Sequence, residues 1–279
     1  MPRQVLIGEH ARPPGRRRRL GIRPPLHTAY DGRMSIPWRG AAELTLVLDR
    51  ASTDAAPELE RGIGLLRVVA AGRRPPTLRL YRPSPTVAFG QRDARLSGFP
   101  EAEAASIRHG FTPLVRRAGG RAAAYHRGCL VVDHIEPAAD AVAGTRIRFA
   151  AFGDFFATVL ADIGLDARVG EVAGEYCPGE FSVHGRRDGV PVVKLVGTAQ
   201  RVIAGAWLFS SVIVVEDSAP LRAVLTDVYA ALELPWRPDT AGAAEDLVPG
   251  VTVDAVESAL LAAYAGVVGL DARAASRLH

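Results

Sequence analysis

The sequence predicts an α+β domain in which runs of short strands alternate with helices. The chain has 279 residues, of which 48% are hydrophobic, so it is long enough to bury a sizeable core. Apolar residues recur at helical spacing in several stretches of more than ten residues, and elsewhere they form short runs bounded by glycine and proline. Short strands in antiparallel-style runs with helices between them favour α+β.

The first helix and the strands around it follow from local patterns. Leu59, Ile63 and Leu66 recur at helical spacing, which predicts a helix over residues 57–71 that a Gly-Arg-Arg-Pro-Pro sequence ends. The rest of the first half is predicted to contain two strands split by a Pro-Ser-Pro turn, at residues 77–82 and 86–89. A helix at residues 101–109 is predicted to follow, and then three strands at residues 113–117, 121–126 and 130–135.

The second half is predicted to contain more helix. Residues 149–163 form a strongly apolar helix, and residues 253–268 have one apolar face, which is typical of a helix that packs on a sheet. Between these two helices, strands are predicted at residues 181–184, 192–196 and 208–215, and a further helix is predicted at residues 220–232.

The first 40 residues are expected to form an irregular Arg/Pro-rich tail, and the folded domain is expected to span residues 41–270. Residues 1–33 hold eight arginines against two acidic residues, a net charge of +6. Because the whole chain carries +4, the remainder carries −2, so the folded part is not basic and nucleic acid is not expected as a partner. Two alternatives to an irregular tail stay open. In the first, the tail is a segment that binds nucleic acid or an acidic surface; in the second, translation starts at Met34 and the tail is not part of the protein.

Composition also excludes several classes of protein. The longest strongly apolar run, residues 207–215, has about half of the roughly 20 residues that a membrane-spanning helix needs. The N-terminus lacks the apolar core and cleavage site of a secretory signal, so we expect a cytoplasmic protein, with a monomer as the simplest state and no membrane partner. Cys129 and Cys177 are too few for a disulfide framework or a metal cluster, so free thiols and no metal site are expected.

A single lysine, Lys194, stands among 34 basic residues. Arginine replaces lysine easily on surfaces, but it does not supply a compact ammonium group that burial and neighbours can tune. A position that keeps lysine against this bias is a candidate for chemistry. It lies in Val-Lys-Leu-Val-Gly-Thr-Ala-Gln, where a strand is expected to carry it into a turn at Gly197 and Thr198.

Two further segments carry reactive or ligand-binding residue types. Arg116 and Arg117 precede Gly119 and Gly120, and such glycines let backbone N–H groups approach a ligand, although an ordinary hairpin turn has the same pattern. Strand alternation would send the two arginines to opposite faces, so only one is expected to point into a pocket. Cys177 precedes a Pro-Gly turn that would present its thiol, and a nearby Lys194 would favour the thiolate.

Cys129 competes for the role of reactive thiol. Its neighbours Leu130, Val131 and Val132 predict a core position on a strand, which favours Cys177.

In this order the three segments resemble the biotin/lipoate A/B protein ligase family. Its hallmarks are an arginine pair followed by a Gly-Gly turn, here Arg-Arg-Ala-Gly-Gly, and a later Lys-x-x-Gly-x-x-Gln strand, and residues 85–92 resemble its Pro-x-Val-x-x-Gly strand end. The resemblance spans roughly residues 44–265. It implies a mixed, largely antiparallel sheet flanked by helices, as in the catalytic domain of biotin and lipoate ligases.

The Tyr-Cys-Pro-Gly-Glu-Phe sequence resembles the octanoyl amidotransferase branch of that family. This resemblance implies transfer of an octanoyl or lipoyl group from a donor such as glycine cleavage H protein, through a Cys177 thioester, onto the lysine of a lipoyl carrier domain, without a cofactor. Lys194 would bind the acyl carbonyl. The further substrate contacts expected are Arg116, Arg117, Gly119, Gly120, His126, Gly197 and Thr198. His126 and His184 are candidate bases, although packed or surface roles are commoner.

Two other functions stay open. An ATP-dependent lipoate–protein ligase would use ATP and Mg, with Lys194 stabilising an acyl-adenylate; Arg121, in place of the family's third glycine, would crowd the adenylate phosphate. A non-catalytic acyl or carrier-protein binder is the third possibility, because Val131 replaces the asparagine of the family's Gly-x-Leu-Asn pattern.

Overall fold

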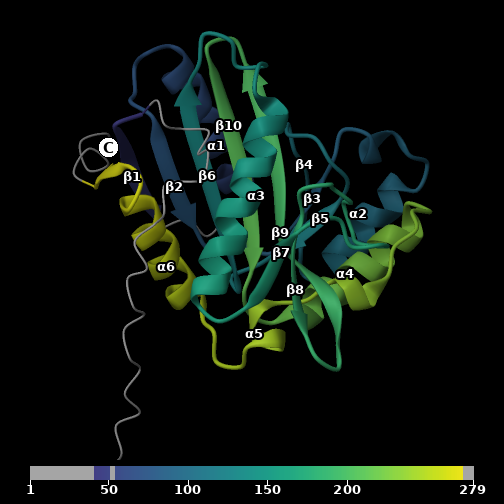
Figure 1. The fold of residues 1–279 in the computed structure, drawn as a ribbon. Helices are drawn as coiled ribbons and strands as arrows, with labels where there is room; N and C mark the ends of the chain where they lie inside the picture. The colour runs from purple at the N-terminus through teal and green to yellow at the C-terminus, as the bar shows by residue number, and fades with distance from the viewer. Residues whose placement is uncertain (1–40, 51–53, 273–279) are drawn as a thin grey trace, which may run out of the picture.

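The computed structural model describes residues 41–50 and 54–272. An eight-stranded sheet forms the centre of the fold (Figure 1). Its strands lie in the order β11 (Gly269–Asp271), β1 (Glu43–Asp49), β2 (Thr77–Tyr81), β6 (Cys129–Pro137), β10 (Ala206–Val214), β9 (Val190–Ile203), β8 (Val183–Arg187) and β7 (Asp166–Val169). Among the described strands of this sheet, β1 pairs parallel with β11 and with β2, and all other neighbours are antiparallel, so the sheet is mixed and largely antiparallel, as expected.

A second sheet of three strands lies beside the first. Its order is β4 (Thr112–Val115), β3 (Thr86–Phe89) and β5 (Ala123–Tyr125), with β3 parallel to β4 and antiparallel to β5. Because β3 separates β4 from β5, the Gly119-Gly120 segment that joins them is a crossing loop. The hairpin alternative for these glycines is therefore wrong.

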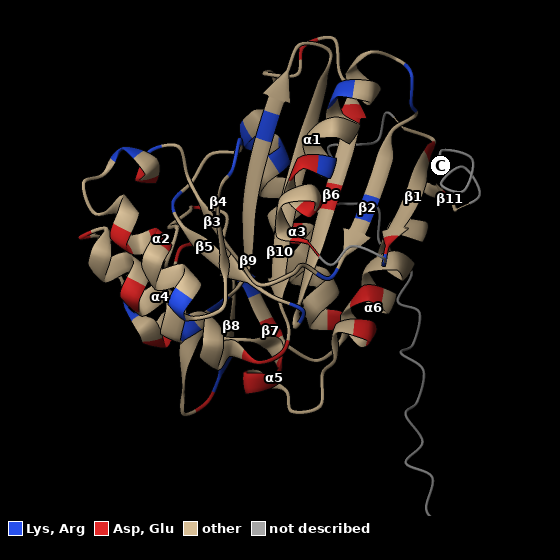
Figure 2. Cartoon of the chain, turned by 180° about the vertical axis from the view of Figure 1, so that it is seen from behind, with Lys and Arg blue, Asp and Glu red and all other residues tan. Residues whose placement is uncertain are grey.

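Helices cover both faces of the large sheet and one side of the small sheet (Figures 1 and 2). The helices α3 (Thr145–Asp162) and α6 (Val253–Ala265) pack on one face, and α1 (Ala55–Ala70) packs on the other. The helices α2 (Phe99–Arg108) and α4 (Ser218–Ala231) pack with β3 and β5. Short helices lie at Ala244–Leu247 (α5), Asp93–Arg95 and Pro238–Thr240.

The predicted turn at Gly197-Thr198 is wrong. The strand β9 continues to Ile203 because residues 196–203 pair without a break with β10. Its other neighbour, β8, ends its pairing at Val196. From Gly197 onward one edge of β9 is therefore free of strand pairing, and the site described below lies along this edge.

The N-terminal tail predicted over the first 40 residues and the alternative start at Met34 lie outside the described residues. Within residues 41–50 and 54–272, no helix has the length and apolar character needed to cross a membrane. The same ranges hold no group of three or more histidine, cysteine, aspartate or glutamate side chains that could bind a metal ion.

Candidate active site

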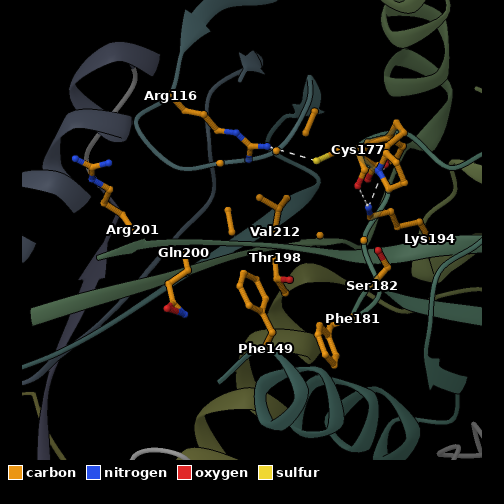
Figure 3. A pocket seen from close by; sticks show the side chains of 18 of the residues that line it. Arg116, Phe149, Cys177, Phe181, Ser182, Lys194, Thr198, Gln200, Arg201 and Val212 are labelled. Atoms are coloured by element: carbon orange, nitrogen blue, oxygen red, sulfur yellow. Dashed lines mark hydrogen bonds between the residues drawn. The ribbon is translucent and has the colours of Figure 1, made fainter. Parts of the chain in front are cut away.

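A cavity of about 580 Å³ runs beside the free edge of β9 (Figure 3). All three segments selected from the sequence contribute to its wall, together with α3 of the large sheet's helical layer. The wall is formed by parts of residues 116–125, by Thr145 and Phe149, by residues 176–182, by Lys194 and residues 197–202, and by Val212. The fold therefore brings together segments that are far apart in the sequence.

Cys177 lies in a tight turn with a backbone conformation unusual for cysteine. Its φ angle is +43°, and its side chain is half-buried. The sulfur accepts hydrogen bonds from the backbone N–H of Arg121 at 3.2 Å and from Nη2 of Arg116 at 3.5 Å. Both donors would stabilise a negative charge on the sulfur, as charge-assisted hydrogen bonds do.

A glycine is required at position 120 because the Gly119-Gly120 loop passes close to this sulfur. Its φ angle is +104°, and a Cβ atom at this position would lie 2.8 Å from Sγ of Cys177 and 2.5 Å from Nη2 of Arg116. Any side chain would therefore displace the sulfur or the guanidinium group. At Gly119, which also lines the cavity, a Cβ atom would meet nothing within 4 Å, so only Gly120 has this requirement.

Lys194 approaches the Cys177 turn from β9 and is buried, with 2% of its surface exposed. Its Nζ donates hydrogen bonds to the carbonyl oxygens of Tyr176 at 3.1 Å and Cys177 at 2.8 Å. Oε2 of the fully buried Glu175 lies 3.3 Å from Nζ as its counter-ion, in an arrangement that is not a hydrogen bond. With the described residues, Nζ therefore makes two hydrogen bonds to backbone carbonyls and one ion pair.

This geometry corrects the expected relation between the lysine and the thiol. Lys194 is bonded to the backbone of the Cys177 turn, and the donors that contact the sulfur are Arg116 and Arg121. Glu175 also accepts bonds from the Gly179 N–H and the Ser182 hydroxyl, so its carboxylate ties the two ends of the turn together. Lys194 and Glu175 thus shape the turn that presents the thiol.

Both arginines of the first motif contribute atoms to the cavity wall, and the expectation that only one side chain points into it stays a prediction. The strand β4 ends at Val115, before either arginine, and strand alternation does not apply to them. Arg116 contacts the sulfur, whereas Arg117 is half-exposed and lies 3.8 Å from Glu60. Gly197 and Thr198 line the same wall, as expected of residues next to Lys194.

Neither candidate histidine is hydrogen-bonded to the thiol. His126 accepts a bond from the Gly128 N–H at Nδ1, and its Nε2 is bonded to the carbonyl of Asp217. His184 is bonded through Nδ1 to the carbonyl of Gly170, and its Nε2 is buried without a hydrogen-bond partner. Neither residue lines the cavity, so the predictions of His126 as a substrate contact and of either histidine as a base lack geometric support.

Arg121 lines a second cavity, of about 390 Å³, which shares Gly119, Gly120 and Pro178 with the first. Its Nη1 binds Oδ1 of the buried Asp93 at 3.0 Å, and Arg121 lies outside the wall of the first cavity. Only the backbone of Arg121 takes part in the site. The expectation that this side chain crowds an adenylate phosphate stays a prediction.

Sequence analysis missed one residue that joins the parts of the site. Tyr229 of α4 is buried, and its hydroxyl accepts a bond from the Cys177 N–H at 2.6 Å and donates one to the carbonyl of Ala122 at 3.0 Å. Burial raises the pKa of this phenol far above its ordinary value, so it remains protonated. In the sequence Tyr229 occupies an apolar helical position, which predicts only a core role.

The two cysteines are expected to differ sharply in reactivity. Cys129 is fully buried on β6, and burial raises its pKa to about 12, so it remains a protonated thiol at pH 8. With limiting iodoacetamide at pH 8, peptide mass spectrometry should find the label on Cys177 and less than about a tenth as much on Cys129. Equal labelling of the folded chain would contradict this description of the two sites.

Comparison with known proteins gives one family match. A family model described as the lipoyl protein ligase A/B catalytic domain matches residues 58–265. Two curated relatives are octanoyl-GcvH:protein N-octanoyltransferases. The relative from Geobacillus kaustophilus is 28% identical over 58% of this chain, and that from Anoxybacillus flavithermus is 32% identical over 62%. The matches cover 55% and 60% of these relatives, less than two thirds of their lengths.

Solved structures share the fold. A lipoate–protein ligase A bound with ATP superimposes with a TM-score of 0.63 at 22% identity, covering 83% of this chain and 87% of that chain. A bipartite lipoate–protein ligase from Thermoplasma acidophilum gives 0.61 at 21% identity, covering 83% and 86%. At this level of identity the likeness establishes the architecture.

Proposed function

The chain belongs to the lipoyl protein ligase A/B catalytic domain family, and from this premise we propose that it is an acyltransferase that moves an octanoyl group through a thioester on Cys177 onto the lysine of a lipoyl carrier domain. The observation that carries the proposal is a half-buried thiol that receives two hydrogen bonds at the wall of a large cavity. The names of the relatives support octanoyl as the group and GcvH as its donor.

In the first step the Cys177 thiolate attacks the acyl carbonyl carbon of the donor. A carbon–sulfur bond forms, the bond to the donor breaks, and the leaving group takes up a proton. Negative charge develops on the acyl oxygen, one bond from the attacked carbon. The Arg121 N–H, which contacts the sulfur, and the ammonium group of Lys194 at the Cys177 turn are the donors proposed to stabilise this charge, and one such donor is typically worth about 10²- to 10³-fold in rate.

In the second step the amine of the carrier lysine attacks the thioester. An amide bond forms, the carbon–sulfur bond breaks, the thiolate is regenerated, and the amine loses a proton. The alkyl chain would lie against Phe149, Val202 and Val212, which give the cavity an apolar wall. No step consumes ATP, because the acyl group is only exchanged, from the donor to Cys177 and from Cys177 to the carrier lysine.

The decisive test incubates the chain with octanoyl-GcvH in the absence of ATP and then adds a lipoyl carrier domain. We expect intact-mass and peptide analysis to find one octanoyl group on Cys177, followed by its appearance on the carrier lysine. Formation of an acyl-adenylate from free acid only with ATP and Mg would indicate the ligase alternative. Binding of the carrier without either product would indicate the non-catalytic binder.

A further inference from the structure

The hydroxyl of Tyr229 connects the two segments that meet at the sulfur. It accepts the N–H of Cys177 on one side and donates to the carbonyl of Ala122 on the other. Ala122 directly follows Arg121, whose N–H contacts the sulfur. A single buried oxygen atom thus sets the distance between the thiol's turn and the loop that supplies its hydrogen-bond donor.

Cys177 needs such support because of its backbone conformation. A φ angle of +43° is unfavourable for a residue with a side chain, and such residues keep this conformation only when their surroundings hold them. Here the N–H of Cys177 is held by Tyr229, and its carbonyl is held by Lys194. Without the hydroxyl, the N–H would lose its partner, and the turn could relax to a negative φ angle.

Relaxation of the turn would change the environment of the sulfur. The bonds from Arg121 at 3.2 Å and from Arg116 at 3.5 Å depend on where the turn places Sγ. Losing them would remove the groups that stabilise a thiolate, so the thiol would react more slowly near neutral pH. Ordinary cysteine thiols ionise at about pH 8.5 without such donors, so the difference in rate should shrink at high pH.

We propose that Tyr229 is a positioning residue for the nucleophile, which holds Cys177 against the Gly119–Arg121 loop in its reactive geometry. The residue lies outside the cavity wall, and its hydroxyl is hydrogen-bonded to backbone groups and not to the sulfur, so it acts through the backbone of Cys177 and Ala122. The inference concerns the nucleophile of the proposed function. Its test therefore uses thiol chemistry that does not depend on transfer.

The experiment compares Tyr229→Phe with the control Tyr264→Phe. Tyr264 is also a buried helical tyrosine, and its hydroxyl contacts His134 in the main core, away from the cavity. We expect Tyr229→Phe to slow alkylation of Cys177 at pH 7 by roughly tenfold, with the difference shrinking as the pH rises to 9.5, while Tyr264→Phe stays within about twofold of the parent. If octanoyl transfer occurs, Tyr229→Phe should lower kcat with little change in KM.

Two results would overturn the proposal. One is alkylation of Tyr229→Phe at the same rate as Tyr264→Phe across the pH range. The other is a slowing that persists unchanged at pH 9.5, because that would show loss of access or folding and not loss of thiolate stabilisation. A chain that shows the expected alkylation pattern but transfers no octanoyl group would contradict the proposed function and leave the role of Tyr229 intact.

Discussion

Replacing Cys177 with serine is expected to abolish octanoyl transfer, with a loss of at least about a thousandfold. A serine hydroxyl is not ionised at neutral pH, and it becomes a nucleophile only when a base removes its proton. His126 and His184 are bonded elsewhere, and among the described residues no histidine contacts residue 177. The Cys177→Ser variant should therefore fold, bind the carrier and form no acyl-enzyme, as measured by intact mass and by transfer to the carrier lysine.

The matched control is Cys129→Ala. Cys129 is buried on β6 and lies outside the cavity wall, so its removal should leave the transfer rate within about twofold of the parent after correction for folded protein. Full activity of Cys177→Ser would exclude the thioester route and favour direct transfer or an adenylate. Loss of activity in both variants with equal loss of thermal stability would show that the assay reports folding.

The main elements of the fold could be predicted because their patterns are local. The strand Thr86–Phe89 is bounded by turn residues, and Leu59, Ile63 and Leu66 identify α1 at helical spacing. The short edge strands β7 and β11 were missed because three or four residues carry little periodicity. The length of β9 was missed because Gly197 resembles a turn residue, and only pairing with β10 keeps the chain extended there.

The site could be predicted only where residue type indicates chemistry. Three features can be recognised from the sequence alone: a single lysine, a cysteine before Pro-Gly and a Gly-Gly pair. The structure places all three around one cavity. Hydrogen bonds made by backbone atoms leave no such signal. The N–H of Arg121 and the carbonyl of Ala122 are backbone groups, and they would make the same hydrogen bonds if these residues had other side chains. In the sequence, Tyr229 resembles any buried helical tyrosine.

Replacing Lys194 with methionine is expected to have the second largest effect, and it should change stability and activity together. The variant keeps a side chain of similar length but leaves the buried Glu175 carboxylate without its counter-ion. Breaking a buried ion pair by removing one partner typically lowers the free energy of unfolding by about 3–5 kcal/mol. Losing a donor to the acyl oxygen should lower the transfer rate by about 10²- to 10³-fold.

A double variant separates these two effects. Adding Glu175→Gln to Lys194→Met removes the unpaired charge, so chemical denaturation should show that much of the lost free energy of unfolding returns, because neutral replacement of a buried pair is often tolerated. The transfer rate should not return, since no ammonium group is restored beside the Cys177 turn. Recovery of both quantities would mean that Lys194 only supports the turn, and that the hydrogen bonds from Arg116 and Arg121 suffice for the chemistry.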